Sequence, residues 1–296
     1  MAKHGCRRRL DTAELAEDFV SKTFDDDDDI EKVAGSIVRA EMELAMLEAN
    51  PTKTHGAYRA KDYRKSTDRE RLHRQILSEL INYEQLDSDD EIRLGKGGAK
   101  PKEPLCEGVA YIVSGAPASG KSTVADELAH KNGAYILDSD YAKRKFPEYE
   151  SYPGGASLVH EESDELVFGS ESSPDCLFEY CIYSGHNVVI PLVGRTQKSV
   201  ETICDKLIKA KYKIHVVNVA LDRYKCTQRA YGRFVESKRY VPLSYVFDEV
   251  GNEPELVYFR LKRDHEAEYE SFSQLSTDVA RGERPRVIEK IGNSPY

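Results

Sequence analysis

One short stretch constrains the fold of this chain more than any other, the sequence GAPASGKST at Gly115–Thr123. It fits the pattern G-x-x-x-x-G-K-[ST] of phosphate-binding loops. Residues 109–114 before it form an apolar, β-branched run typical of a buried strand. Residues 122–131 after it have apolar side chains at helical spacing and end at Asn132-Gly133, a helix stop. Because strand, glycine loop and helix follow in the required order, we predict a nucleotide-binding loop rather than a chance match.

The residue types in this loop suit the binding of ATP and Mg²⁺. Glycines let backbone N–H groups close around phosphate oxygens, and the helix that follows presents its positive end to them. Lys121 is expected to reach the terminal phosphates, and the Ser122 hydroxyl is expected to bind Mg²⁺. The predicted cofactor-binding residues are Gly115, Ala116, Pro117, Ala118, Ser119, Gly120, Lys121, Ser122 and Thr123.

Composition bounds the class of protein. Charged residues make up 32% of the 296 residues, and no apolar run approaches transmembrane length, so no membrane association is expected. The net charge of -9 disfavours a nucleic-acid partner. Three arginines near the N-terminus precede no apolar stretch, so they do not indicate a secretory signal. The six cysteines form no CxxC pair and indicate reduced thiols, as in a cytoplasmic protein.

Residues 1–60 differ from the rest and are predicted to form a separate N-terminal helical segment. Asp11-Thr12 can cap a short helix that runs to Phe24, and a longer helix is expected over residues 30–49. The longer helix is apolar on more than one side, so it should pack on something larger than its short neighbour.

Five consecutive aspartates, Asp25–Asp29, separate these two expected helices. They can be a solvated linker that also places negative charge at a helix N-terminus. They can also be a metal site or a mimic of nucleotide phosphates. Both interpretations stay open at this point.

Residues 61–296 are predicted to form one α/β domain. A helix is expected over 67–83, then a surface linker over 87–103. Strands are expected at 109–114, 134–137, 188–190 and 214–220, with helices between them, and the chain from Asp222 onward is expected to be mostly helical. Such an alternation predicts a P-loop NTPase-like parallel sheet with helices on both faces.

Polar residues that can carry chemistry follow the second expected strand. Asp138 and Asp140 leave that strand at the edge where ligands bind in such sheets. One can hold Mg²⁺ or its water, and the other can take a proton from a substrate hydroxyl. The alternative is that one of them, Asp138 above all, merely caps a helix.

Arginines return in the C-terminal half, at Arg223, Arg229, Arg233 and Arg239. Arginines on a lid-like helix can balance the charge of a migrating phosphoryl group, although a solvated helix face accounts for at least one of them. The sequence lacks an N-K-x-D guanine signature and the D-E pair of motor ATPases. We therefore favour a small-molecule kinase.

These residues resemble the zeta toxins, P-loop kinases of bacterial toxin–antitoxin systems, over about residues 67–264. The resemblance rests on the P-loop, LDSDYAKRKFPEY at 137–149, GASLVHEESDEL at 155–166, NVVIPLVGRT at 187–196 and the arginines. Members transfer phosphate from ATP to a sugar hydroxyl, most often of UDP-N-acetylglucosamine, which poisons cell-wall synthesis. The resemblance thus implies a kinase that acts on a nucleotide-sugar.

The resemblance assigns roles residue by residue. Asp140 matches the general base, while Lys121 and Ser122 serve ATP and Mg²⁺. Arg229 and Arg239 match the phosphate-binding arginines, with Arg233 as an alternative. On the substrate side, Gly194-Arg195-Thr196 matches the family's G-R-T, and Asp138, Glu162, Arg195 and Thr196 are the expected contacts.

One departure bears on the substrate. Well-studied members have an acidic residue that contacts the sugar where this chain has Pro191 or Leu192. An apolar side chain cannot accept those hydrogen bonds. Other polar residues, His160, Glu161 and Glu162, can replace them or can be an exposed helix N-terminus.

The resemblance also bears on residues 1–60, which precede the helix that usually begins the family domain. In toxin–antitoxin pairs a separate helical antitoxin covers the nucleotide site. We expect residues 1–60 either to do this in cis or to meet a separate antitoxin; a structural cap is the alternative. Three functions stay open: a kinase for a nucleotide-sugar, a kinase for a dinucleotide or a polynucleotide end, and a non-catalytic ATP-binding regulatory module.

Overall fold

The computed structural model describes residues 8–24, 29–48, 50–151, 154–171, 173–280 and 282–296. Asp25–Asp28 of the aspartate run lie outside the described residues. The described residues form one six-stranded sheet in the order β2-β3-β1-β4-β5-β6. Its strands are β1 (Val109–Ser114), β2 (Tyr135–Ile136), β3 (Val188–Leu192), β4 (Lys213–Ala220), β5 (Ser271–Ser276) and β6 (Arg286–Gly292).

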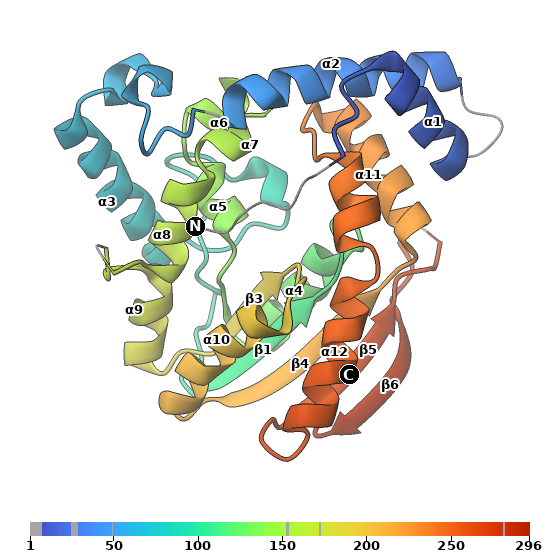
Figure 1. Ribbon diagram of the computed structural model, residues 1–296. Helices are drawn as coiled ribbons and strands as arrows, with labels where there is room; N and C mark the ends of the chain where they lie inside the picture. Colours follow the sequence, from blue (N-terminus) through green and yellow to red (C-terminus); the bar gives the residue numbers. More distant parts are fainter. Residues whose placement is uncertain (1–7, 25–28, 49, 152–153, 172, 281) are drawn as a thin grey trace.

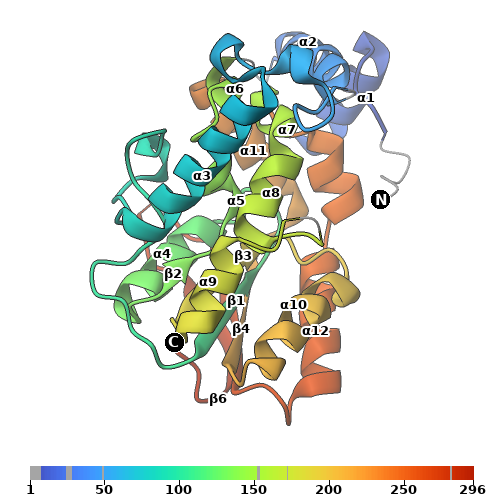
Figure 2. The same cartoon turned by 90° about the vertical axis from the view of Figure 1, so that its left-hand side faces the viewer.

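Helices cover both faces of this sheet, as predicted for a P-loop fold. The P-loop helix α4 (Lys121–Lys131) packs on one face, whereas α10 (Gln197–Lys209) and α12 (Glu253–His265) pack on the other (Figure 2). β1 pairs in parallel with β3 and with β4, so the P-loop leaves the middle of the sheet. β5 also pairs in parallel with β4, whereas the edge strand β6 runs antiparallel to β5, so the sheet is mostly parallel.

The C-terminal part differs from expectation. The chain after Asp222 does contain α11 (Arg223–Ser237), the π-helical turn η4 (Tyr245–Val250) and α12, but it also contributes the strands β5 and β6. β5, with the sequence SFSQLS, is buried along its whole length. Its polar side chains have partners inside the fold: Ser271 Oγ lies 2.7 Å from His215 Nδ1, and Gln274 Nε2 donates to Glu255.

The N-terminal segment forms two helices close to the expected bounds. Thr12 caps α1 (Ala13–Thr23) by accepting from Leu15 N, and Asp29 accepts from Lys32 N at the start of α2 (Ile30–Glu48). Asp29 therefore places negative charge at the N-terminus of α2, as expected if the aspartate run is a linker. In Figure 1, α2 runs along the top of the molecule, above α6 (Glu148–Ser151) and α7 (Gly155–Leu158) at one end and α11 at the other.

Two hydrophobic clusters hold these layers together. The larger one lies between the sheet and its covering helices. The smaller one joins apolar residues of α1 and α2 to α11, η4 and the P-loop residue Ala116. Within the described ranges, no helix combines the length and apolarity needed to cross a bilayer.

Candidate active site

The loop Gly115–Thr123 connects β1 to α4, as predicted, and two of its glycines are required by its shape. A side chain at Gly115 would place Cβ 2.7 Å from Val219 O. Gly120 has φ +89°, a left-handed conformation that disfavours other residues. The loop is held from outside by Thr277, whose hydroxyl donates to Ser119 O at 2.6 Å. These constraints fix the backbone of the loop, and glycine-rich loops of this kind can present N–H groups to phosphate oxygens.

Lys121 begins α4 and folds back onto the loop. Its Nζ donates to Ala116 O at 2.7 Å. Burial lowers the pKa of Lys121 to about 8, against the attraction of Asp138 and Asp140. The two residues after it, Ser122 and Thr123, are exposed at the helix N-terminus. The lysine and both aspartates thus share one electrostatic environment.

Asp138 and Asp140 follow β2 and begin α5 (Ser139–Lys143). Asp138 caps this helix by accepting from Asp140 N at 2.8 Å, so the capping role considered for it is present. Burial, with repulsion from Asp140, raises the pKa of Asp138 to about 7. A carboxylate with that pKa is also suited to exchange a proton near neutral pH.

Asp140 has the opposite electrostatic setting. Its Oδ1 accepts from Lys143 Nζ at 2.8 Å, and this lysine lowers the pKa of Asp140 to about 2. Burial of Lys143 would lower its pKa, but the attraction of Asp140 is stronger than this effect, so the pKa of Lys143 is raised. Asp140 is therefore ionised at neutral pH. Sequence reasoning missed Lys143, although its position three residues after Asp140 on a helix is a detectable signal.

The three arginines considered for phosphate binding have different surroundings. Arg229 Nη2 donates to Thr277 O at 3.0 Å, so it lies beside the residue that holds the P-loop. Arg233 is exposed, and its charge acts on Lys121 and Asp140. Arg239, beyond α11, binds Asp90 and Tyr149 instead. The structure brings Arg229 and Arg233 toward the P-loop and gives Arg239 a separate set of partners.

The remaining expected substrate residues lie around β3 and α8 (His160–Phe168). Thr196 caps α10 by accepting from Ser199 N, and Arg195 Nη1 pairs with Glu249 at 2.8 Å. Gly194, just before them, packs against Ser114 at the end of β1. Arg195 and Thr196 therefore follow a strand that lies beside the P-loop strand.

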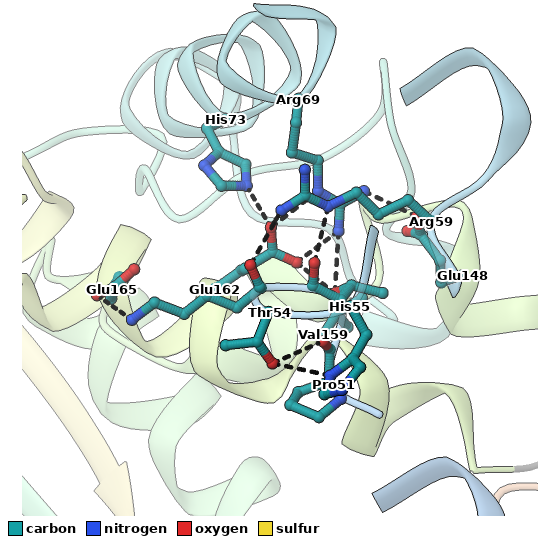
Figure 3. Close-up of polar contacts among 12 residues, drawn as sticks. Pro51, Thr54, His55, Arg59, Arg69, His73, Glu148, Val159, Glu162 and Glu165 are labelled. Atoms are coloured by element: carbon teal, nitrogen blue, oxygen red, sulfur yellow. Dashed lines mark hydrogen bonds and ion pairs between the residues drawn. The ribbon is translucent and has the colours of Figure 1, made fainter. Parts of the chain in front are cut away.

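Glu162 lies in a different environment from the one expected of a substrate contact. It is 2% exposed, and Arg69 on α3 (Ser66–Asn82) binds both of its oxygens, at 2.9 and 2.6 Å. His73 Nε2 lies 3.1 Å from Oε1, and the Thr52 hydroxyl lies within hydrogen-bond distance of Oε2. Figure 3 shows Arg69 and His73 converging on Glu162. Because these partners occupy its carboxylate, we assign Glu162 to the fold rather than to substrate binding.

This buried ion cluster also ties the chain after α2 to the α/β domain. Ala60 N and Arg69 Nη1 both donate to Glu148 Oε1, each at 2.8 Å. Arg59 Nη2 lies 3.9 Å from Glu162 Oε1. The short turns η1 (Gly56–Tyr58) and η2 (Lys61–Tyr63) lie in this segment. Residues 51–60 are therefore anchored in the domain by buried ion pairs and hydrogen bonds, whereas α1 and α2 pack on it mainly through apolar side chains.

Comparison with known proteins is consistent with this geometry. A family model described as Zeta toxin matches residues 97–265. A chain of the PezAT chromosomal toxin–antitoxin system of Streptococcus pneumoniae is 15% identical, over 76% of this chain and 82% of that chain, with a TM-score of 0.51. A chain of the AvrRxo1-ORF1:-ORF2 complex is 15% identical, over 79% and 68%, with a TM-score of 0.48. No curated protein matches the sequence significantly. At 15% identity the PezAT chain supports the fold alone.

Proposed function

This chain belongs to the zeta toxin family, and from that premise we propose that it is an ATP-dependent kinase that phosphorylates a hydroxyl of a nucleotide-sugar. The observation that carries the proposal is the shared environment of Lys121, Asp138 and Asp140, where both carboxylates act to raise the pKa of Lys121 and Asp140 raises the pKa of Asp138. A P-loop lysine binds the phosphates of the donor, and a carboxylate beside it can orient and deprotonate an acceptor hydroxyl.

The proposed reaction divides its steps among these residues. The P-loop amides and Lys121 bind the β- and γ-phosphates, while Arg233 and Arg229 balance the charge that spreads over the transferred group. Asp140, kept ionised by Lys143, accepts the proton of the acceptor hydroxyl. Asp138 holds the start of α5 and so positions Asp140.

The residues present fit a magnesium ion bound with the nucleotide. The described residues contain no group of three or more His, Cys, Asp or Glu arranged to hold a metal ion. Mg²⁺ beside ATP needs one or two protein oxygens, since phosphates and water supply the rest. The Ser122 hydroxyl and Asp138 can provide these oxygens, and the ion would neutralise charge on the phosphates.

The decisive experiment follows labelled γ-phosphate from ATP to UDP-N-acetylglucosamine, to other nucleotide-sugars, to a dinucleotide and to a polynucleotide end. We expect transfer to a nucleotide-sugar, with loss of transfer but retention of ATP binding in Asp140→Asn. Asp205→Asn, at an exposed position on α10, is the matched control and should transfer normally. Retained biological effect in Asp140→Asn would instead favour a regulatory ATP-binding module.

We further propose that α1 and α2 inhibit this kinase in cis. α2 contacts two separate parts of the domain: Ser36 Oγ lies 3.0 Å from Tyr231 Oη on α11, and Leu44 and Leu47 lie against Gly154. α1 also contacts α11, since Gln228 on α11 donates to Thr23 O on α1. Because α11 carries Arg229 and Arg233, these contacts restrain the helix that must adjust around ATP.

Truncation tests the inhibition, and the structure decides where to cut. Deletion of residues 1–50 removes α1 and α2 but keeps Thr52 and Arg59, which the buried Glu162 and Glu148 cluster requires. We expect ATP turnover and toxicity to rise in this variant. Ile37→Asp, which places a charge at a fully buried contact of α2, is a second variant that should act in the same direction. Unchanged turnover in both folded variants would leave α1 and α2 as a structural cap.

A further inference from the structure

A second group of positive charges lies one helical turn beyond Asp140. Arg144 follows α5, and its backbone N–H donates to Asp140 O at 3.1 Å. Its side chain is 7% exposed, and its charge contributes to the lowered pKa of Asp140. Arg239 approaches from the loop after α11 and binds the hydroxyl of Tyr149. We call Arg144, Arg239 and Tyr149 the arginine clamp.

The clamp is occupied by one carboxylate of the chain itself. Asp90 Oδ1 accepts from Arg144 Nη1 at 2.9 Å and also from Arg239 Nη2. Asp90 lies on the short turn η3 (Asp89–Glu91), in the polar segment expected to be a surface linker. The Asp90 side chain is 69% exposed, in contrast to the two arginines that bind it. The donors are thus built into the fold, whereas the acceptor is carried by a surface turn.

Within the clamp, two guanidinium groups share the one carboxylate of Asp90, while the charge of Arg144 also acts on Asp140. Arg144 Nε is buried and has no hydrogen-bond partner among the described residues, so the clamp also has a donor to spare. A diphosphate has more negative charge and more acceptor oxygens than a carboxylate, and arginine pairs bind phosphate in a bidentate manner.

We propose that the arginine clamp binds the diphosphate of the acceptor, and that Asp90 occupies it as an intramolecular competitor. This inference rests on the proposed kinase function, because it names the part of the acceptor that the same site recognises. Binding of the diphosphate one turn from Asp140 would place the attached sugar beside the general base. Arg239 then serves the acceptor rather than ATP. Release of Asp90 is the step that admits the acceptor.

Inorganic pyrophosphate is the probe, and the test is independent of catalysis. All variants carry Lys121→Ala, which weakens anion binding at the P-loop. Isothermal titration should then show that Asp90→Ala binds pyrophosphate about tenfold or more tightly than the parent, because two charge-assisted hydrogen bonds no longer compete. Asp87→Ala removes the same charge from an exposed residue of the same segment and should leave the affinity unchanged.

Arg239→Gln, added to Asp90→Ala, should abolish the gain, and Tyr149→Phe should reduce it. Circular dichroism confirms folding, which the exposed position of Asp90 should preserve. An equal gain in Asp87→Ala would show a general effect of net charge and would overturn the inference. No gain in Asp90→Ala, or a gain that survives Arg239→Gln, would overturn it as well. Since pyrophosphate binding does not require phosphate transfer, a failed kinase assay leaves this result interpretable.

Discussion

Replacing Arg69 with methionine should destabilise the protein far more than an ordinary ion pair would suggest. Arg69 is 2% exposed and donates three hydrogen bonds of 2.6–2.9 Å to Glu148 and Glu162, which are equally buried. It also lies over the ring of Phe146, with Cζ 4.6 Å from the ring centroid. The variant would leave two buried carboxylates, with Arg59 Nη2, 3.9 Å from Glu162 Oε1, as a remaining arginine contact.

The expected cost is about 3–5 kcal/mol in the free energy of unfolding, the range for breaking a buried pair from one side. Urea unfolding followed by circular dichroism measures it, with an unchanged slope as the sign of a two-state comparison. Arg71→Met is the matched control. Arg71 pairs with Asp68 at a similar 2.8 Å but is 70% exposed, so its loss should cost at most about 1 kcal/mol.

The same cluster gives a second readout through Glu162. Burial alone would raise the pKa of Glu162, but Arg69 and His73 outweigh burial and hold it well below its usual range. Because the pKa of Glu162 is lower in the folded state than in the unfolded state, its contacts add to the free energy of unfolding above the ordinary carboxyl pKa. This contribution is lost as pH falls from the ordinary pKa through the lowered one. Adding Glu162→Gln to Arg69→Met should recover part of the loss. A cost for Arg69→Met no larger than that of Arg71→Met would refute the reasoning.

Two further predictions concern the P-loop and the base. Gly120→Ala should cost about 1–2 kcal/mol in stability and weaken ATP binding, because φ is +89° and the new Cβ would lie 3.2 Å from Thr277 Cγ2. Thermal unfolding and ATP-binding measurements test this. Gly232→Ala, where a new Cβ would meet open space on α11, is the control. Lys143→Met should raise the pKa of Asp140 by about 1–3 units and move the acid limb of the pH–rate profile upward by the same amount, since the cation that favours its charged form is gone. An unshifted limb would show that Asp140 is not the titrating base.

Much of the fold could be predicted because its signals are local. The glycine spacing at Gly115–Thr123, the apolar strands and the capping residue Thr12 each act within a few positions along the chain. β5 was missed because its serines and glutamine break the apolar pattern of a buried strand. Their hydrogen-bond partners, such as His215, come from other elements. Burial of polar residues depends on such distant partners, which the pattern does not contain.

The candidate site shows the same division. Lys121, Asp138 and Asp140 were predicted from motifs at the ends of strands, and the structure brings them together. The pairing of Glu162 with Arg69, 93 positions apart, has no local signal, so the sequence pattern does not show that this acid belongs to a buried ion cluster. The pairing of Asp90 with Arg239, 149 positions apart, was missed for the same reason.

Phosphate transfer by the chain without residues 1–50 tests the central claim most directly. Incubated with γ-labelled ATP and a nucleotide-sugar, this variant should move the label to the sugar nucleotide faster than the full chain does. The same variant with Asp140→Asn should bind ATP yet transfer no label. Absence of transfer to any acceptor by the folded variant, or equal transfer after Asp140→Asn, would contradict the account.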